Sequence, residues 1–310
     1  MSLVVVGTMA YDTVKTPFGE REWSLGGSAT YFSLSSSFFT DIKLVAVIGE
    51  DFKAEDIEMI EKHGVDTSGV HKAAGKSFHW KGEYGFDLNE AKTLDTQLNV
   101  LADFSPELPE SYRDAEYLFL ANIDPKLQRQ VIDQVKNPKL IACDTMNFWI
   151  DGCVDELKKT LERVDILIIN EGEARQLAGT PNLVKAAQEI KAMGPTTLII
   201  KQGEYGALLF HDGSIFSAPA YPLERVFDPT GAGDTFAGGF MGHIARMNDG
   251  TLSNTLLRQA TVMGSVMASF NVEEFSMDRI MRLNRSEIAE RFRQFKRLTN
   301  FEDISDEELI

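Results

Sequence analysis

Small and acidic residues are concentrated in the segment Asp228-Pro229-Thr230-Gly231-Ala232-Gly233-Asp234. The small residues let the backbone of this loop approach a ligand without a clash from a side chain. A helical pattern begins near Asp234, so free N–H groups and the positive end of the helix dipole are predicted to point into the loop and bind an anion. A carboxylate there could take the proton of a hydroxyl group that attacks a bound phosphate. A helix cap without a catalytic role is the alternative.

Short apolar runs alternate along the chain with segments of helical periodicity. The runs suit strands that are buried on both faces of a parallel sheet, and they lie at residues 3–6, 42–48, 117–120, 140–143, 166–169, 198–200 and 207–210. Helices are predicted at residues 28–39, 51–63, 125–136, 155–161, 171–177 and 183–193, and the chain beyond residue 234 is expected to be mostly helical. This alternation predicts an α/β fold with a doubly wound, mostly parallel sheet flanked by helices.

Two stretches, residues 13–25 and 73–101, interrupt this alternation. They lack a helical period and carry glycine and aromatic residues among alternating polar ones. The pattern predicts strands with one solvated face, inserted beside the main sheet as a small β-sheet lid. Surface hairpins without a function are the alternative. We therefore expect one domain over residues 1–310, with lid insertions at about 13–25 and 73–101.

The net charge of the chain indicates which classes of molecule it binds. The chain has 31 Lys and Arg against 47 Asp and Glu, a formal net charge of −16. A negative field repels phosphate backbones and anionic lipids, so we expect neither nucleic-acid nor membrane binding. No apolar run approaches the roughly 20 residues that span a bilayer, and no signal peptide is visible, so a cytoplasmic location is expected.

The loop at residues 228–234 resembles the D-x-x-G-A-G-D motif of the ribokinase-like (PfkB-type) family of carbohydrate and nucleoside kinases. In that family the last Asp is the catalytic base and the Gly-Ala-Gly amides form an anion hole. The resemblance implies these roles for Asp234 and for Gly231, Ala232 and Gly233. Because Asp234 lies near a helix N-terminus, we expect its pKa to be low. The motifs of P-loop and protein kinases are absent from the sequence.

Two further segments are similar to elements that lie on the nucleotide side in this family. Asn170 and Glu173 match its N-x-x-E element, which implies that both bind Mg²⁺ through water; a helix cap explains them equally well. A K/T-x-G-x-x-G element is matched by Lys201, Gly203 and Gly206, which implies contact with the nucleotide; a plain hairpin is the alternative. Several members also bind a monovalent cation such as K⁺ beside the D-x-x-G-A-G-D loop, where this chain has Asp228, Thr230 and the segment 269–276. We therefore expect Thr230 to be a cofactor-binding residue.

The resemblance extends to the substrate side. Asp12 matches a substrate-binding Asp, and Gly26 and Gly27 match the start of the G-G-x-x-x-N motif, whose glycines let the backbone approach a sugar. Tyr31 stands where the family usually has Asn, so an amide that can bridge two sugar hydroxyls is missing. Asn147 follows the run 140–143, at the sheet edge where α/β enzymes bind ligands.

Together these matches imply an ATP-dependent kinase that phosphorylates a hydroxyl group of a sugar or nucleoside, with ATP and Mg²⁺ as cofactors and K⁺ as a further candidate. The lid would close over the substrate, and lid strands in this family often form homodimers. Two alternatives stay open: a kinase of a vitamin-like alcohol, and a non-catalytic sugar- or nucleotide-binding regulatory protein on the same scaffold.

Overall fold

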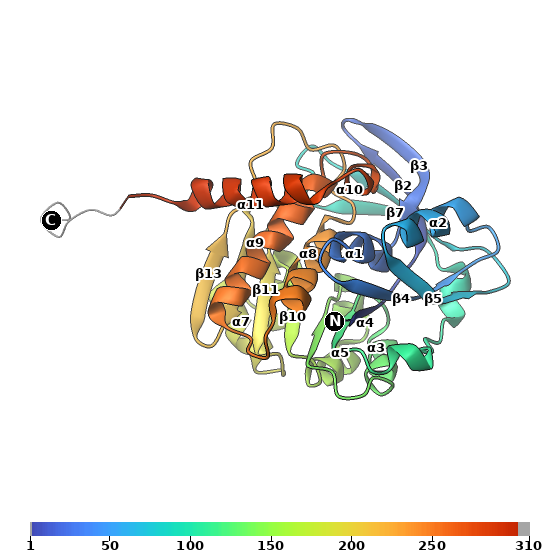
Figure 1. The fold of residues 1–310 in the computed structure, drawn as a ribbon, viewed down its shortest axis with the longest axis horizontal. Helices are drawn as coiled ribbons and strands as arrows, with labels where there is room; N and C mark the ends of the chain where they lie inside the picture. The colour runs from blue at the N-terminus through green and yellow to red at the C-terminus, as the bar shows by residue number, and fades with distance from the viewer. Residues whose placement is uncertain (1, 303–310) are drawn as a thin grey trace, which may run out of the picture.

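A nine-stranded sheet forms the centre of the computed structural model, which describes residues 2–302 (Figure 1). Its order is β13-β12-β11-β10-β9-β8-β1-β4-β5, and only β12 and β13 run antiparallel to their neighbours. The strands are β1 (Ser2–Val6), β4 (Asp41–Ile48), β5 (Val65–Lys72), β8 (Tyr117–Leu120), β9 (Leu140–Cys143), β10 (Ile166–Asn170), β11 (Thr197–Lys201), β12 (Ala207–His211) and β13 (Ser214–Ala218). All the strands predicted from apolar runs are therefore confirmed.

Helices cover both faces of this sheet. They are α1 (Ser28–Ser36), α2 (Ala54–Lys62), α3 (Pro125–Ile132), α4 (Asn147–Gly152), α5 (Val154–Leu161), α6 (Glu171–Ala178), α7 (Leu183–Lys191), α8 (Ala232–Met247), α9 (Asn254–Asn271), α10 (Asp278–Met281) and α11 (Arg285–Thr299). Short 3₁₀ turns lie at η1 (Asn99–Asp103), η2 (Glu110–Tyr112) and η3 (Gly203–Tyr205). No helix within residues 2–302 is long and apolar enough to cross a membrane.

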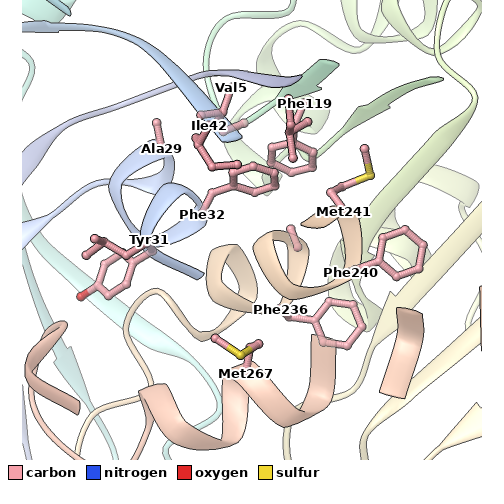
Figure 2. Packing of buried hydrophobic residues seen from close by; sticks show 14 of the residues in the cluster. Val5, Ala29, Tyr31, Phe32, Ile42, Phe119, Phe236, Phe240, Met241 and Met267 are labelled. Atoms are coloured by element: carbon pink, nitrogen blue, oxygen red, sulfur yellow. The ribbon is translucent and has the colours of Figure 1, made fainter. Parts of the chain in front are cut away.

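Two hydrophobic cores, one on each face, confirm the doubly wound arrangement. Alternate residues of β1 enter different cores: Leu3 and Val5 pack with α1, α8 and α9, whereas Val4 and Val6 pack with α3, α5 and α7. Figure 2 shows the first core, in which Phe32 of α1 points toward Phe119 of β8 while Tyr31 leaves the same helix in another direction. The Phe32 and Phe119 rings stack at 4.1 Å, which fixes α1 against the sheet.

A second sheet has the order β3-β2-β6-β7. Its strands are β2 (Ala10–Thr16), β3 (Gly19–Gly26), β6 (Phe78–Tyr84) and β7 (Ala91–Gln97). We call these four strands the lid sheet; its existence was predicted, although β2 begins earlier than residue 13 and so includes Asp12. Residues 1 and 303–310 of the predicted single domain lie outside the described residues.

Candidate active site

The glycine loop leads into α8 as the sequence predicted. Gly231 caps the helix in the left-handed conformation, with φ of 71°, and Thr235 makes the first intrahelical bond, from its amide to the Gly231 carbonyl at 2.8 Å. The amides of Gly233 and Asp234 precede that bond and so lack an intrahelical acceptor. The Ala232 amide donates to the Pro229 carbonyl at 3.1 Å, so this predicted member of the anion hole already has a partner within the turn.

Asp234 lies in the first turn of α8, and its side chain is partly exposed. Burial, followed by the negative charge of Asp144, raises the pKa of Asp234 to about 7, although Lys201 opposes the rise. The expectation of a low pKa is therefore wrong, because a helix terminus stabilises a carboxylate by only about 0.3–1 kcal/mol, less than the cost of burial beside a second carboxylate. A group with this pKa can exchange a proton near neutral pH.

Lys201 lies at the end of β11, where it reaches the same helix terminus. Its ammonium is 3.3 Å from Asp144 Oδ2, and a Cβ placed on Gly233 would lie 2.9 Å from Nζ. Burial lowers the pKa of Lys201, but Asp144, Glu173 and Asp234 outweigh burial and raise it overall. The lysine therefore stays protonated at the mouth of α8.

Asn170 and Glu173 form a capping box at the start of α6. The Glu173 amide donates to Asn170 Oδ1 at 2.8 Å, and the Asn170 amide donates to Glu173 Oε2 at 2.8 Å. The helix-cap alternative is thus realised, but Glu173 Oε1 is not used by the box. Burial and then Asp144 raise the pKa of Glu173 to about 7.

This corner of the site fits a hydrated divalent cation. Asp144 raises the pKa values of Glu173 and Asp234, Asp234 raises the pKa of Glu173, and the Lys201 ammonium opposes the rise at all three carboxyl groups. When ionised they leave uncompensated negative charge, which a dication would neutralise. Among residues 2–302 no group of three or more acidic, His or Cys side chains is arranged to bind a metal directly. Mg²⁺ usually keeps several of its water ligands in protein sites.

Gly203 and Gly206 form the turn between β11 and β12. Both have positive φ, 55° and 101° respectively, and the Gln202 amide donates to the Gly206 carbonyl at 2.7 Å. A Cβ on Gly203 would lie 2.5 Å from Asn89 Oδ1, which belongs to the β6–β7 turn of the lid sheet. The lid hairpin therefore rests on the turn that is predicted to contact the nucleotide.

Asp12, Gly26 and Gly27, which are predicted to bind the substrate, come together at the base of the lid sheet. Asp12 is only 5% exposed, and a Cβ on Gly26 would lie 2.0 Å from Asp12 Oδ2, so the carboxyl packs on the glycine backbone. Burial, then Asp228 and Asp234, raise the pKa of Asp12 to about 8. Gly27 has φ of 96° and starts α1, where its carbonyl accepts hydrogen bonds from the amides of Thr30 and Tyr31.

Tyr31 lies directly against the glycine loop. It is 3% exposed, and a Cβ on Gly231 would lie 2.4 Å from its ring atoms. The departure from the family's Asn thus places an aromatic ring over the first glycine of the predicted anion hole. Burial is the main cause that raises the pKa of Tyr31, and Asp228 and Asp12 add to it.

Tyr84 joins the lid sheet to the same loop, a contact that the sequence analysis did not identify. Its hydroxyl accepts a hydrogen bond from Thr230 Oγ1 at 3.3 Å. Around Thr230 the polar atoms are paired: its amide donates to Asp228 Oδ1 at 2.9 Å, and its carbonyl accepts from Asn271 Nδ2 at 2.8 Å. Asp228 Oδ2 accepts from the Ser276 amide at 3.0 Å.

Asn147 lies in a different setting from the other predicted residues. It is exposed at the first turn of α4, where its side chain accepts a hydrogen bond from the Phe148 amide at 2.9 Å. Asp144, three residues earlier in the same segment, is the residue that turns toward Lys201. The signal in the sequence for Asp144 is a single acid directly after a buried strand.

Comparison with known proteins places the whole fold in one family. The model of the pfkB family carbohydrate kinases matches residues 2–281. The chain is 31% identical over 252 residues to the cytidine kinase of Thermococcus kodakarensis, covering 79% of this chain and 89% of that protein.

Solved structures share the fold at lower identity. A nucleoside kinase of Burkholderia thailandensis in complex with inosine has a TM-score of 0.76 and 19% identity, covering 94% of this chain and 97% of that one. An E. coli chain in complex with ATP and Mg²⁺ has a TM-score of 0.75 and 19% identity, covering 94% and 99%. The implied ribokinase-like fold is confirmed. The chain therefore belongs to the pfkB family of carbohydrate kinases and is a phosphotransferase that acts on a hydroxyl group of a sugar or nucleoside.

Proposed function

We propose that this chain is an ATP-dependent nucleoside kinase in which Asp234 is the base and the first-turn amides of α8 form the anion hole. The position of Asp234 carries the proposal: the carboxyl lies in the first turn of α8, beside Lys201 and within electrostatic range of Asp12. A nucleoside is preferred to a free sugar as substrate because the 31% identical relative is named a cytidine kinase.

The reaction needs a proton acceptor and a stabiliser of negative charge on the transferring phosphoryl group. The acceptor hydroxyl would give its proton to Asp234 as its oxygen bonds to the γ-phosphorus, and the bond from that phosphorus to ADP would break. The amides of Gly231, Gly233 and Asp234, with Lys201 beside them, would hold the equatorial oxygens. With a pKa of about 7, a substantial fraction of Asp234 is ionised at neutral pH.

The remaining predicted residues would position the two substrates. Asn170 and Glu173 would hold Mg²⁺ through water, and Mg²⁺ would screen the charge of the phosphates. Gly203 and Gly206 would lie along the nucleotide, under the lid hairpin. A K⁺ ion near Thr230 stays a candidate, although the Thr230 carbonyl is already an acceptor.

Asp12, Gly26, Gly27 and Tyr31 would contact the substrate hydroxyls. Because the pKa of Asp12 is raised to about 8, its carboxyl is mostly protonated at neutral pH before a ligand binds and can donate as well as accept a hydrogen bond. Asn147 stays a candidate for contact with the substrate, since it is exposed at the start of α4. The lid sheet would exclude water from the closed site, and a homodimer through the lid sheet stays a prediction for sedimentation analysis.

A phosphoryl-transfer screen tests this function. ATP and Mg²⁺ are supplied with cytidine, other nucleosides, ribose or hexoses, and ADP and the phosphorylated product are both measured. We expect product with a nucleoside, much less with free sugars, and about 10²–10⁴-fold slower turnover with the Asp234→Asn variant as control. Phosphorylation of free sugars only would refute the nucleoside assignment, and tight binding without turnover of any acceptor would favour the regulatory alternative.

A further inference from the structure

The Lys201–Asp144 pair is the most enclosed ion pair at the carboxyl ends of the main-sheet strands. The side chains are 16% and 8% exposed, and Nζ lies 3.3 Å from Oδ2. The main sheet fixes the backbone of both residues. β10 pairs with β9 on one side and with β11 on the other, Asp144 directly follows β9, and Lys201 is the last residue of β11. Asp144 is held in turn, because its Oδ1 accepts from the Thr145 amide at 2.8 Å and its carbonyl accepts from Gln128 Nε2 at 3.1 Å.

The ammonium is directed at the anion hole. The 2.9 Å between Nζ and the position of a Cβ on Gly233 means that Lys201 occupies the space that any larger residue at 233 would need. Gly233 does not have the positive φ that would by itself require glycine. A side chain at position 233 would therefore have to displace the Lys201 ammonium.

The charges around Lys201 suit a site that binds a phosphate group and then releases it. The carboxylates of Asp144, Glu173 and Asp234 all act on Lys201, so its positive charge is compensated when no phosphate is bound. A buried ion pair contributes little to stability compared with apolar residues of similar size, which makes a purely structural role a weak explanation. Negative charge on the equatorial oxygens of a transferring phosphoryl group would find Nζ already in place, without reorganisation.

We propose that the Lys201 ammonium supplies the positive charge of the anion hole. Asp144 is a positioning residue that holds this ammonium beside Gly233. This inference rests on the proposed function and adds a named residue, Asp144, to its machinery. In the transfer step the acceptor oxygen bonds to phosphorus, the phosphorus–oxygen bond to ADP breaks and the hydroxyl proton goes to Asp234. Lys201 keeps its proton throughout.

The test compares Lys201→Met, Asp144→Asn and the double variant that carries both substitutions. Steady-state kinetics gives kcat and KM for ATP, and calorimetry gives the affinity for ADP with and without aluminium fluoride, a planar mimic of the transferring group. We expect Lys201→Met to lower kcat about 10²–10³-fold, the loss typical of an anion-hole donor. Its affinity for ADP with aluminium fluoride should fall by a similar factor, while its affinity for ADP alone changes only a few-fold.

Asp144→Asn should lower kcat less, about tenfold, because the charge remains but its position is loosened. The double variant distinguishes the loss of the Lys201 charge from the effect of an unpaired Asp144 carboxylate. It removes the carboxylate at position 144 that Lys201→Met leaves unpaired, so activity near that of wild type would mean that Lys201→Met failed only because Asp144 had lost its partner, and would overturn the inference. Activity as low as that of Lys201→Met supports it.

Two controls complete the design. Arg129→Met breaks another partly buried pair, with Glu156 between α3 and α5, where the side chains are 19% and 25% exposed; this variant should keep its kcat. Gly233→Ala should fold normally, since its methyl group meets only the flexible end of Lys201, but should lose activity as the ammonium is displaced. If wild type phosphorylates no acceptor, the proposed function fails; equal affinity of wild type and Lys201→Met for ADP with aluminium fluoride would overturn this inference separately.

Discussion

Burial of Asp12 should make the stability of the protein depend on pH. Its side chain is 5% exposed, and burial together with Asp228 and Asp234 raises its pKa from 3.8 to about 8. A carboxyl group whose pKa is higher in the folded than in the unfolded state favours folding while it is protonated. That contribution is complete below pH 3.8 and is lost as the pH rises through about 8.

The size of the effect follows from the two pKa values. With a folded pKa of about 8, Asp12 contributes roughly 2.7 kcal/mol to the free energy of unfolding at pH 6 and roughly 0.4 kcal/mol at pH 8. The contribution therefore falls by about 2 kcal/mol over this interval. Glu173 and Asp234 have raised pKa values as well, whereas the pKa values of His79, His211 and His243 are lowered, so a comparison with a variant is needed to isolate Asp12.

Urea unfolding of the nucleotide-free protein measures this contribution directly. Wild type and Asp12→Asn are unfolded at pH 6 and pH 8, since Asn keeps the shape of the side chain but does not titrate. We expect the free energy of unfolding of wild type, relative to the variant, to fall by about 2 kcal/mol between pH 6 and pH 8. A difference that stays constant would show that Asp12 is ionised throughout, and the reasoning from burial would be refuted.

Three further predictions concern the loop and the lid sheet. Because Asp234 must be ionised to act as a base and its pKa is raised to about 7, kcat/KM should fall about tenfold per pH unit below that value; a flat profile from pH 5 to 8 would contradict this. Gly231→Ala should destabilise the protein more than Gly179→Ala in thermal unfolding. Both residues are left-handed, with φ of 71° and 63°, but only Gly231 faces a ring, that of Tyr31, and nothing lies within 4 Å of a Cβ on Gly179; equal losses would mean that Tyr31 does not constrain the loop. Tyr84→Phe removes the acceptor of the Thr230 hydroxyl, so ATP hydrolysis without a substrate should rise several-fold; an unchanged rate would show that this contact does not hold the lid sheet closed.

The central sheet could be predicted from sequence because its strands are buried on both faces. Runs such as Ile166–Ile169 have no polar residue, as is typical of a strand that is covered on both faces of a parallel sheet. The edge strands β5 and β13 were not predicted for the opposite reason, since only one residue of each strand is buried. The start of α8 was predicted because glycine and a first-turn acid are local signals.

What could not be predicted depends on contacts between distant segments. The contact between Tyr84 and Thr230 joins residues 146 positions apart, and the pair of Asp144 with Lys201 joins residues 57 positions apart. The pKa of Asp234 was misjudged because the helix terminus is visible in the sequence, whereas burial and the neighbouring Asp144 are not. Family motifs named the positions, but the charges around those positions come from the fold.

Replacement of Asp234, the proposed base, tests the central claim most directly. Asp234→Asn keeps the size of the side chain and removes the proton acceptor, so kcat for nucleoside phosphorylation should fall by about 10²–10⁴ while the affinity for ATP stays within a few-fold. Single-turnover kinetics and calorimetry on the same preparation measure both quantities. A variant that keeps most of the wild-type rate would show that Asp234 does not take the proton.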